Sequence, residues 1–190
     1  MSHHYFDLAE DVHVPGRWYL GDPVDDRGLP LADPWQFRKG HPVSVRNRLK
    51  VPIRRSGSPL DFSTAGVGVT PIVHVKVASL FAELAPDDVQ IIPVDIDSFP
   101  EQYCLLNTLH LIPCIDDKLS TEVQYWRAQD GVPEKVGLYK SVAGMKIDSG
   151  KVGTARVFRT WGWTIALIVS GTIKEALESI GATGTKFREV

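Results

Sequence analysis

Cysteine is scarce in this sequence, which holds only Cys104 and Cys114. Two cysteines form at most one bridge, and this excludes a disulfide scaffold. Both lie in segments rich in leucine and isoleucine, which predicts small buried apolar side chains, with a disulfide or a reactive thiol as the alternatives. Long apolar runs are also missing. The longest strongly apolar stretch, Ile165 to Val169, is far shorter than a membrane span.

Charge of one sign does not dominate either. The formal net charge is −2 and the pI is about 6.3, so no overall field favours nucleic acid or an anionic membrane. The first thirteen residues hold no basic segment followed by an apolar stretch, so we expect no secretory signal and a cytoplasmic protein. With 190 residues, 43% hydrophobic and 23% charged, the chain is predicted to form a single globular domain over residues 1–190.

Known catalytic motifs are absent. The sequence has no Gly-x-Ser-x-Gly, Walker-type or Cys-x-x-Cys motif, and Gly66-Val67-Gly68 supplies only two of the three glycines of a dinucleotide loop. His110 and Cys114 are four residues apart on an expected strand, where that separation spans about 13 Å and prevents them from sharing a zinc ion. We therefore expect no metal and no cofactor.

The first sixty residues are rich in proline and glycine, which excludes long helices and predicts turns with short extended pieces. Large apolar residues lie between these breakers and predict an ordered, loop-rich amino-terminal layer that packs on the core; they are Trp18, Tyr19, Leu20, Trp35 and Phe37. An aromatic ligand cage is the alternative. The basic run from Arg46 to Arg55 alternates with apolar residues and favours a half-buried strand over a phosphate-binding segment.

Two amphipathic helices are predicted. In the first, Thr70-Pro71 supplies an N-cap and a first-turn proline, and apolar residues recur at helical spacing up to Leu84. Its β-branched start, from Ile72 to Val77, is also compatible with a short strand. The second helix begins at Thr172 with a capping box to Glu175, and ends at Gly181.

Extended segments surround these helices. Because they cluster instead of alternating with helices, we predict an α+β fold with a mainly antiparallel sheet, two or three helices and the loop-rich layer. Turns are expected at Asn107-Thr108 and at Trp161-Gly162-Trp163. The predicted strands are Val89 to Ile96, Tyr103 to Leu106, Leu109 to Ile115, Lys146 to Asp148, Ala155 to Thr160 and Thr164 to Ser170.

Acidic residues are concentrated in residues 86–134, which carry ten acidic and two basic side chains. The densest group is Asp116, Asp117 and Glu122. Adjacent carboxylates can hold a divalent cation or divide acid and base roles. The same pattern is typical of a polar turn followed by a helix that starts at Ser120, with Ser120 or Thr121 as its cap.

Taken in order, a set of landmarks resembles one family, the immunity proteins numbered family eleven of bacterial polymorphic toxin systems. The landmarks are Arg17-Trp18, Leu60-Asp61-Phe62, Pro93-Val94, Tyr103, Asn107, Cys114-Ile115-Asp116, Phe158-Arg159, Ile168-Val169-Ser170, Thr183-Gly184, Phe187 and Val190. The resemblance covers about 170 residues and carries no catalytic motif. It implies an intracellular, non-enzymatic antidote that binds a cognate toxin, and toxins encoded beside such proteins often resemble metal-dependent nucleases.

An anionic surface can imitate a phosphate backbone and steer association with a basic cleft. We therefore hypothesise a toxin-binding surface made of Asp116, Asp117 and Glu122, with Tyr125 and Trp126 as aromatic anchors. A second candidate patch is the turn that bears Trp161 and Trp163, of which at least one is expected to pack inward. The alternatives are a small hydrolase or metal-dependent enzyme that uses the 116–122 carboxylates, and a small-ligand binder lined by the amino-terminal tryptophans.

Overall fold

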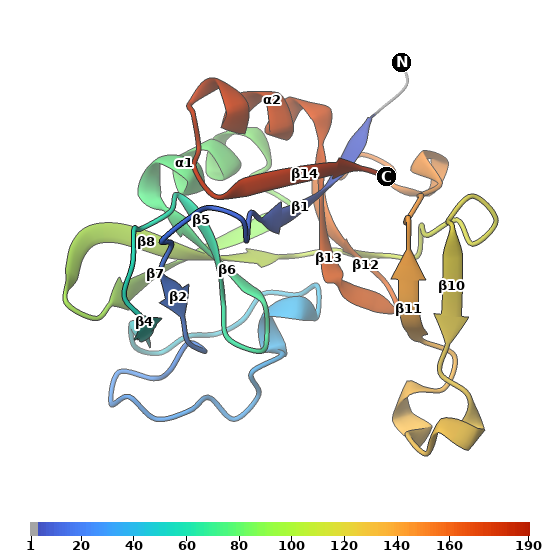
Figure 1. Cartoon of the computed structure of the whole chain (residues 1–190), viewed down its shortest axis with the longest axis horizontal. Helices are drawn as coiled ribbons and strands as arrows, with labels where there is room; N and C mark the ends of the chain where they lie inside the picture. The colour runs from blue at the N-terminus through green and yellow to red at the C-terminus, as the bar shows by residue number, and fades with distance from the viewer. Residues whose placement is uncertain (1–3) are drawn as a thin grey trace.

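The computed structural model describes residues 4–190, which form an α+β fold with two α-helices and three sheets (Figure 1). The large sheet has the order β3-β7-β8-β6-β5-β2-β4, and the small sheet has the order β14-β1-β13-β12-β9. The third sheet pairs β10 (Glu122–Tyr125) with β11 (Tyr139–Ala143). The large sheet contains β2 (Tyr19–Leu20), β3 (Leu49–Val51), β4 (Ile53–Arg55), β5 (Phe62–Ala65), β6 (Thr70–His74), β7 (Val89–Ile96) and β8 (Phe99–Thr108). The small sheet contains β1 (Tyr5–Glu10), β9 (Leu111–Ile112), β12 (Val157–Thr160), β13 (Trp163–Ser170) and β14 (Thr185–Glu189).

The prediction of an α+β fold is confirmed, but the sheets are partly mixed. Chain neighbours such as β7 and β8 or β12 and β13 pair antiparallel, as hairpins must. Parallel pairs form between β3 and β7, between β2 and β5, and between β9 and β12. Long connections lead to these strands, so no tight turn dictates their direction.

The first helix, α1 (Val75–Leu84), begins later than the start at Thr70-Pro71 that the cap signal predicts. Residues 70–74 instead form β6, which pairs with β5 and β8 in the middle of the large sheet. The buried Ile72 and Val73 explain the difference, because β-branched side chains suit a pleated surface. His74 then caps α1, its ring accepting a hydrogen bond from the Lys76 amide at 3.2 Å.

The second helix, α2 (Gly171–Ser179), is confirmed, including its buried face at Ile173 and Leu177. The capping box predicted between Thr172 and Glu175 is not confirmed. The helix starts one residue earlier than expected, and its N-cap Ser170 makes no capping hydrogen bond through its side chain. The helix ends close to the expected Gly181, which has a positive φ of 61°.

Among the predicted strands, Val89–Ile96 is β7 with the same bounds, and the segments before and after Gly162 are β12 and β13. The predicted strand at residues 109–115 shrinks to β9, and residues 146–148 contribute only an isolated bridge between Ile115 and Ile147. The turn predicted at Asn107-Thr108 is wrong. β8 continues through both residues, and the buried Asn107 amide donates to the His41 carbonyl and to Gln90 Oε1, both at 3.0 Å.

The amino-terminal layer is ordered, with its short strands and a single 3₁₀ turn, η1 (Gln36–Arg38). Trp18 and Phe37 are buried in the core, as predicted, whereas Tyr19 and Trp35 are exposed and lie against arginine side chains. Residues 49–55 of the basic run form β3 and β4, separated at Pro52, and Leu49 and Val51 are buried. The half-buried strand predicted there is therefore two short strands.

Both cysteines are free and buried. Burial raises the pKa of Cys104, and it raises that of Cys114 to about 11, so both thiols are protonated at neutral pH. This confirms the prediction of small buried apolar side chains.

Candidate functional site

The predicted binding residues lie on a hairpin that is separate from the two main sheets (Figure 1). We call residues 116–144 the arm. Its strands are β10 (Glu122–Tyr125) and β11 (Tyr139–Ala143), paired antiparallel with an irregularity after Gln124. The connection between them contains the 3₁₀ turns η2 (Ala128–Asp130) and η3 (Pro133–Lys135). A two-stranded hairpin is only marginally stable alone, so the arm needs anchors to the rest of the molecule.

Asp117 is the main polar anchor within the arm. The hydroxyl groups of Tyr125 and Tyr139 both donate to its carboxylate, that of Tyr139 at 2.7 Å, and the two rings lie 4.7 Å apart between centroids. Burial raises the pKa of both phenols. Hydrogen bonds with Tyr125 and Asp117 raise the pKa of Tyr139 further. Both hydroxyls therefore stay protonated and act as donors. The backbone amide of Tyr139 also donates to the Gly162 carbonyl, which ties the arm to the β12–β13 turn.

Asp116 and Glu122 have different surroundings. The Asp116 carboxylate accepts from the backbone amides of Lys118 and Leu119 and closes a turn. Glu122 is exposed on β10 and accepts from the Gln124 amide at 2.6 Å. The polar turn predicted here is present, but the predicted helix start at Ser120 is wrong. Ser120 is buried, donating to the Asp116 carbonyl and accepting from the Lys146 amide, and the chain continues as a strand.

Trp126 is half-buried and lies between two lysines. The ammonium groups of Lys135 and Lys140 each lie 5.0 Å from the centroid of its ring, and Lys140 also pairs with Asp130 at 2.6 Å. Cation–π contacts of this kind hold a ring in place at the surface. A partner protein that contacts Trp126 must therefore approach it beside two positively charged side chains.

The two candidate patches of the sequence meet in one hollow of about 480 Å³. Asp116, Asp117, Lys118 and Tyr139 line it from the arm, Lys151 also borders it, and Trp161 lines it from the β12–β13 turn. Trp161 is 48% exposed, whereas Trp163 packs against the core, as expected for one of the pair. Three of the predicted site residues, Glu122, Tyr125 and Trp126, do not line this hollow. The meeting of arm and turn follows from tertiary contacts, and no local signal in the sequence could have indicated it.

The acidic block of residues 86–134 does not form one continuous surface. The buried Asp88 accepts from the backbone amides of Arg156 and Val157 and contacts His110, while Asp95 pairs with Arg48. Within residues 4–190, no group of three or more histidine, cysteine or acidic side chains is placed to hold a metal ion. Both Asp117 oxygens accept hydrogen bonds from phenols within the arm.

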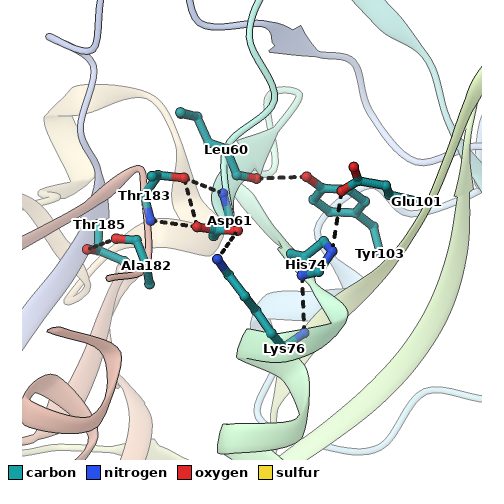
Figure 2. Close-up of polar contacts among 9 residues, drawn as sticks. All are labelled: Leu60, Asp61, His74, Lys76, Glu101, Tyr103, Ala182, Thr183 and Thr185. Carbon is teal, nitrogen blue, oxygen red and sulfur yellow. Dashed lines mark hydrogen bonds and ion pairs between the residues drawn. The ribbon is translucent and has the colours of Figure 1, made fainter. Parts of the chain in front are cut away.

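Residues of the family landmarks meet at a second place (Figure 2). Asp61 accepts from the Thr183 amide at 2.8 Å and from its hydroxyl at 2.9 Å, and the Lys76 ammonium lies 2.9 Å from its other oxygen. Nearby, the buried Tyr103 hydroxyl donates to the Leu60 carbonyl at 3.2 Å. Motifs up to 122 residues apart in sequence are thus joined. These landmarks are structural, since they join the start of α1 to the loop after α2.

We expect Asp117→Ala to loosen the arm without unfolding the core. Two hydroxyl–carboxylate hydrogen bonds would be lost, each contributing about 1.5 kcal/mol to closing the arm. Trypsin should cleave at the arm lysines and arginine at least about tenfold faster, since that factor corresponds to about 1.4 kcal/mol of local opening. Mass spectrometry of the fragments measures this. Glu134→Ala, an exposed acid of the same arm, is the control, and equal cleavage of the two variants would contradict the anchoring role of Asp117.

None of the helices described for this chain is long and apolar enough to cross a membrane. No curated protein matches the chain. Residues 4–190 match the model of the Immunity protein family (Imm11), which spans nearly every residue and agrees with the resemblance carried by the landmarks. The chain therefore belongs to the immunity protein family Imm11.

Proposed function

We propose that this protein is a non-enzymatic, cytoplasmic antidote that binds a cognate bacterial toxin of a polymorphic toxin system and blocks it. The proposed contact surface is the arm together with Trp161, and it includes the predicted residues Asp116, Asp117, Glu122, Tyr125 and Trp126. The proposed toxin is a nuclease, whose basic cleft would accept the carboxylates.

The observation that carries the proposal is the hollow that joins arm and turn. It combines two carboxylates and two lysines with an exposed tryptophan, and further exposed apolar side chains lie along the arm at Leu119, Tyr125 and Val136. Tryptophan and tyrosine supply most of the binding energy in many interfaces, while surrounding charges set the association rate and the choice of partner. Family membership supports the role of toxin antidote.

The test uses the toxin encoded beside this protein. Glu122 and Trp161 are the residues to change, because both are exposed and neither contributes to the core. The double variant Glu122→Lys/Trp161→Ala should bind the toxin about 100-fold more weakly, because it removes an aromatic anchor and reverses a charge. Protection of cells that express the toxin should fall, and the melting temperature should stay unchanged.

The matched control is Glu83→Lys, which reverses an exposed acid on α1, away from the arm (Figure 1). It should bind and protect like the unmodified protein. Unchanged affinity of the double variant would remove this surface from the interface. Failure of the unmodified protein to bind the toxin would overturn the proposed function.

A further inference from the structure

Among residues 4–190, no strand pairs with the outer edge of β10. β10 pairs with β11 on its other side, and β11 lies between β10 and the two main sheets, so β10 is the outermost strand of the arm (Figure 1). Glu122, Gln124 and Tyr125 are exposed along β10. An edge strand presents N–H and C=O groups that can form hydrogen bonds with an extended segment of another chain.

The register of the arm shows which backbone amides of β10 point outward. The Thr121 amide donates to the carbonyl of Gly144 at the end of β11. The backbone groups of successive strand residues point to alternate sides, so the Val123 amide also points toward β11. The amides of Glu122 and Gln124 therefore point away from β11, toward the open edge.

Both edges of the large sheet are blocked against such pairing. On the first edge, Lys50 of β3 exchanges two backbone hydrogen bonds with Val24, at 2.8 Å and 3.0 Å. On the other edge, β4 is three residues long and carries the exposed Arg54 and Arg55. Short edge strands and charged side chains discourage the addition of a further strand.

The edges of the small sheet are blocked as well. β9 is two residues long, and Gly40 lies so close to it that a Cβ there would be 2.8 Å from the Leu111 amide nitrogen. β14 carries the exposed Lys186 and Arg188. These are again a short strand, a covering segment and basic side chains, which are the usual means of preventing unwanted strand pairing.

β10 has none of these protections. It is four residues long, contains no lysine, arginine or proline, and carries a single charge, on Glu122. The extra residue at the irregularity of the hairpin, Lys140, belongs to β11, so the irregularity adds no residue to β10. A two-stranded sheet is also only marginally stable alone, and a third strand would stabilise it. An open edge in a molecule whose other edges are blocked indicates a place for a partner.

We propose that the toxin adds a strand to the outer edge of β10, so that an extended toxin segment becomes the third strand of the arm sheet. This inference rests on the proposed function, because the arm is the contact surface assigned there. Backbone hydrogen bonds supply the affinity, and the alternate side chains supply the specificity. Opposite charges on neighbouring strands attract, so the toxin segment carries a basic residue beside Glu122.

Hydrogen exchange of the full chain, followed by NMR with and without the toxin encoded beside it, tests the proposal. In the free protein, the amides of Glu122 and Gln124 should exchange fast and that of Val123 slowly. Bound toxin should slow the exchange of the two outward amides at least about tenfold, because they become hydrogen-bonded. Toxin binding that leaves both amides exchanging as before would overturn the added strand alone. Absence of toxin binding would overturn the proposed function.

Gln124→Pro removes one outward N–H, and an edge strand tolerates proline where its N–H would face solvent. Gln124→Ala is the matched comparison, because it removes the same side-chain amide and keeps the backbone N–H. Gln124→Pro should bind the toxin at least about tenfold more weakly than Gln124→Ala, as expected for a lost backbone hydrogen bond. Equal affinities of the two variants would contradict the proposal. Trypsin digestion shows whether the arm is intact in Gln124→Pro; if it is not, the exchange measurement decides.

The alternative occupant of this edge is a second copy of the chain. In that case the amides of Glu122 and Gln124 would already exchange slowly in the free protein, more so at higher protein concentration, and sedimentation would show a dimer. That result would overturn the proposal. Protection that appears only with the toxin, in a protein that sediments as a monomer, supports it.

Discussion

Gly184→Ala should destabilise the protein by about 3–4 kcal/mol, the largest effect we expect from a single methyl group. Gly184 has a φ of 83°, where an L side chain costs about 1–2 kcal/mol. A Cβ there would also lie 2.3 Å from the Phe62 carbonyl oxygen and 2.9 Å from Leu60 Cβ. A backbone oxygen cannot rotate away, so the loop after α2 would have to leave β5. Thermal unfolding should show a decrease of about 10 °C.

Gly181→Ala is the matched control. Gly181 also has a positive φ, of 61°, but a Cβ there would meet nothing within 4 Å. Only backbone strain applies, so we expect a loss of about 1 kcal/mol. Equal losses for the two variants would show that strain alone matters, and that the close approach of Gly184 to β5 contributes nothing.

Asp61→Ala should cost about 3 kcal/mol at neutral pH, and part of this cost should be lost in acid. The change removes two hydrogen bonds from Thr183 and the ion pair with Lys76 (Figure 2). It also leaves the Thr183 amide without its acceptor, and charge-assisted hydrogen bonds contribute about 1.5–3 kcal/mol each.

The pH dependence follows from the pKa of Asp61. Burial raises this pKa, but the hydrogen bonds from Thr183 and the charge of Lys76 outweigh burial, so it lies below its ordinary value of 3.8. A lowered native pKa stabilises the fold above the unfolded value, and this stabilisation is lost as the pH falls through the native pKa. Urea unfolding of both proteins between pH 7 and pH 2 should therefore give a constant difference down to about pH 4 and a shrinking one below it.

Asp33→Ala is the control for this series. Asp33 also has a lowered pKa, owing to its hydrogen bonds from Lys39 and the Trp35 amide, but it lies in an exposed part of the amino-terminal layer. Exposed ion pairs contribute about 0–1 kcal/mol, so this variant should unfold nearly like the unmodified protein. A difference for Asp61→Ala that persists unchanged at pH 2 would mean that packing, and not the carboxylate charge, accounts for the cost.

Local sequence patterns correctly predicted the elements whose secondary structure depends little on their tertiary neighbours. The apolar spacing of Ile173 and Leu177 identified α2 because one face of that helix is buried. The length and composition of the segment from Val89 to Ile96 identified β7. The helix start predicted at Thr70-Pro71 is wrong because these residues belong to a central strand of the large sheet, and strand pairing there outweighs the capping pattern. The turn predicted at Asn107 is wrong because its side-chain amide donates hydrogen bonds to the His41 carbonyl and to Gln90 Oε1, which hold this residue within the fold.

For the candidate site, too, the sequence predicted some features and the tertiary structure decided the others. Sequence patterns pointed to Asp116, Asp117, Glu122, Tyr125 and Trp126 as chemically suited to recognition. They could not show that Asp117 is bound by two phenols, that Trp126 lies between two lysines, or that Trp161 borders the same hollow. Each of these contacts joins segments that separate strands place together.

Composition, apolar periodicity and ordered landmarks were thus enough to establish the fold class, the α2 face and the family. The tertiary structure decided which acids are free and which landmarks hold the fold. It also left the outer edge of β10 without a paired strand among residues 4–190. The physical reason is that burial and pairing depend on neighbours brought close only by folding, as between Asp61 and Thr183, whereas periodicity and capping act over a few residues of the chain.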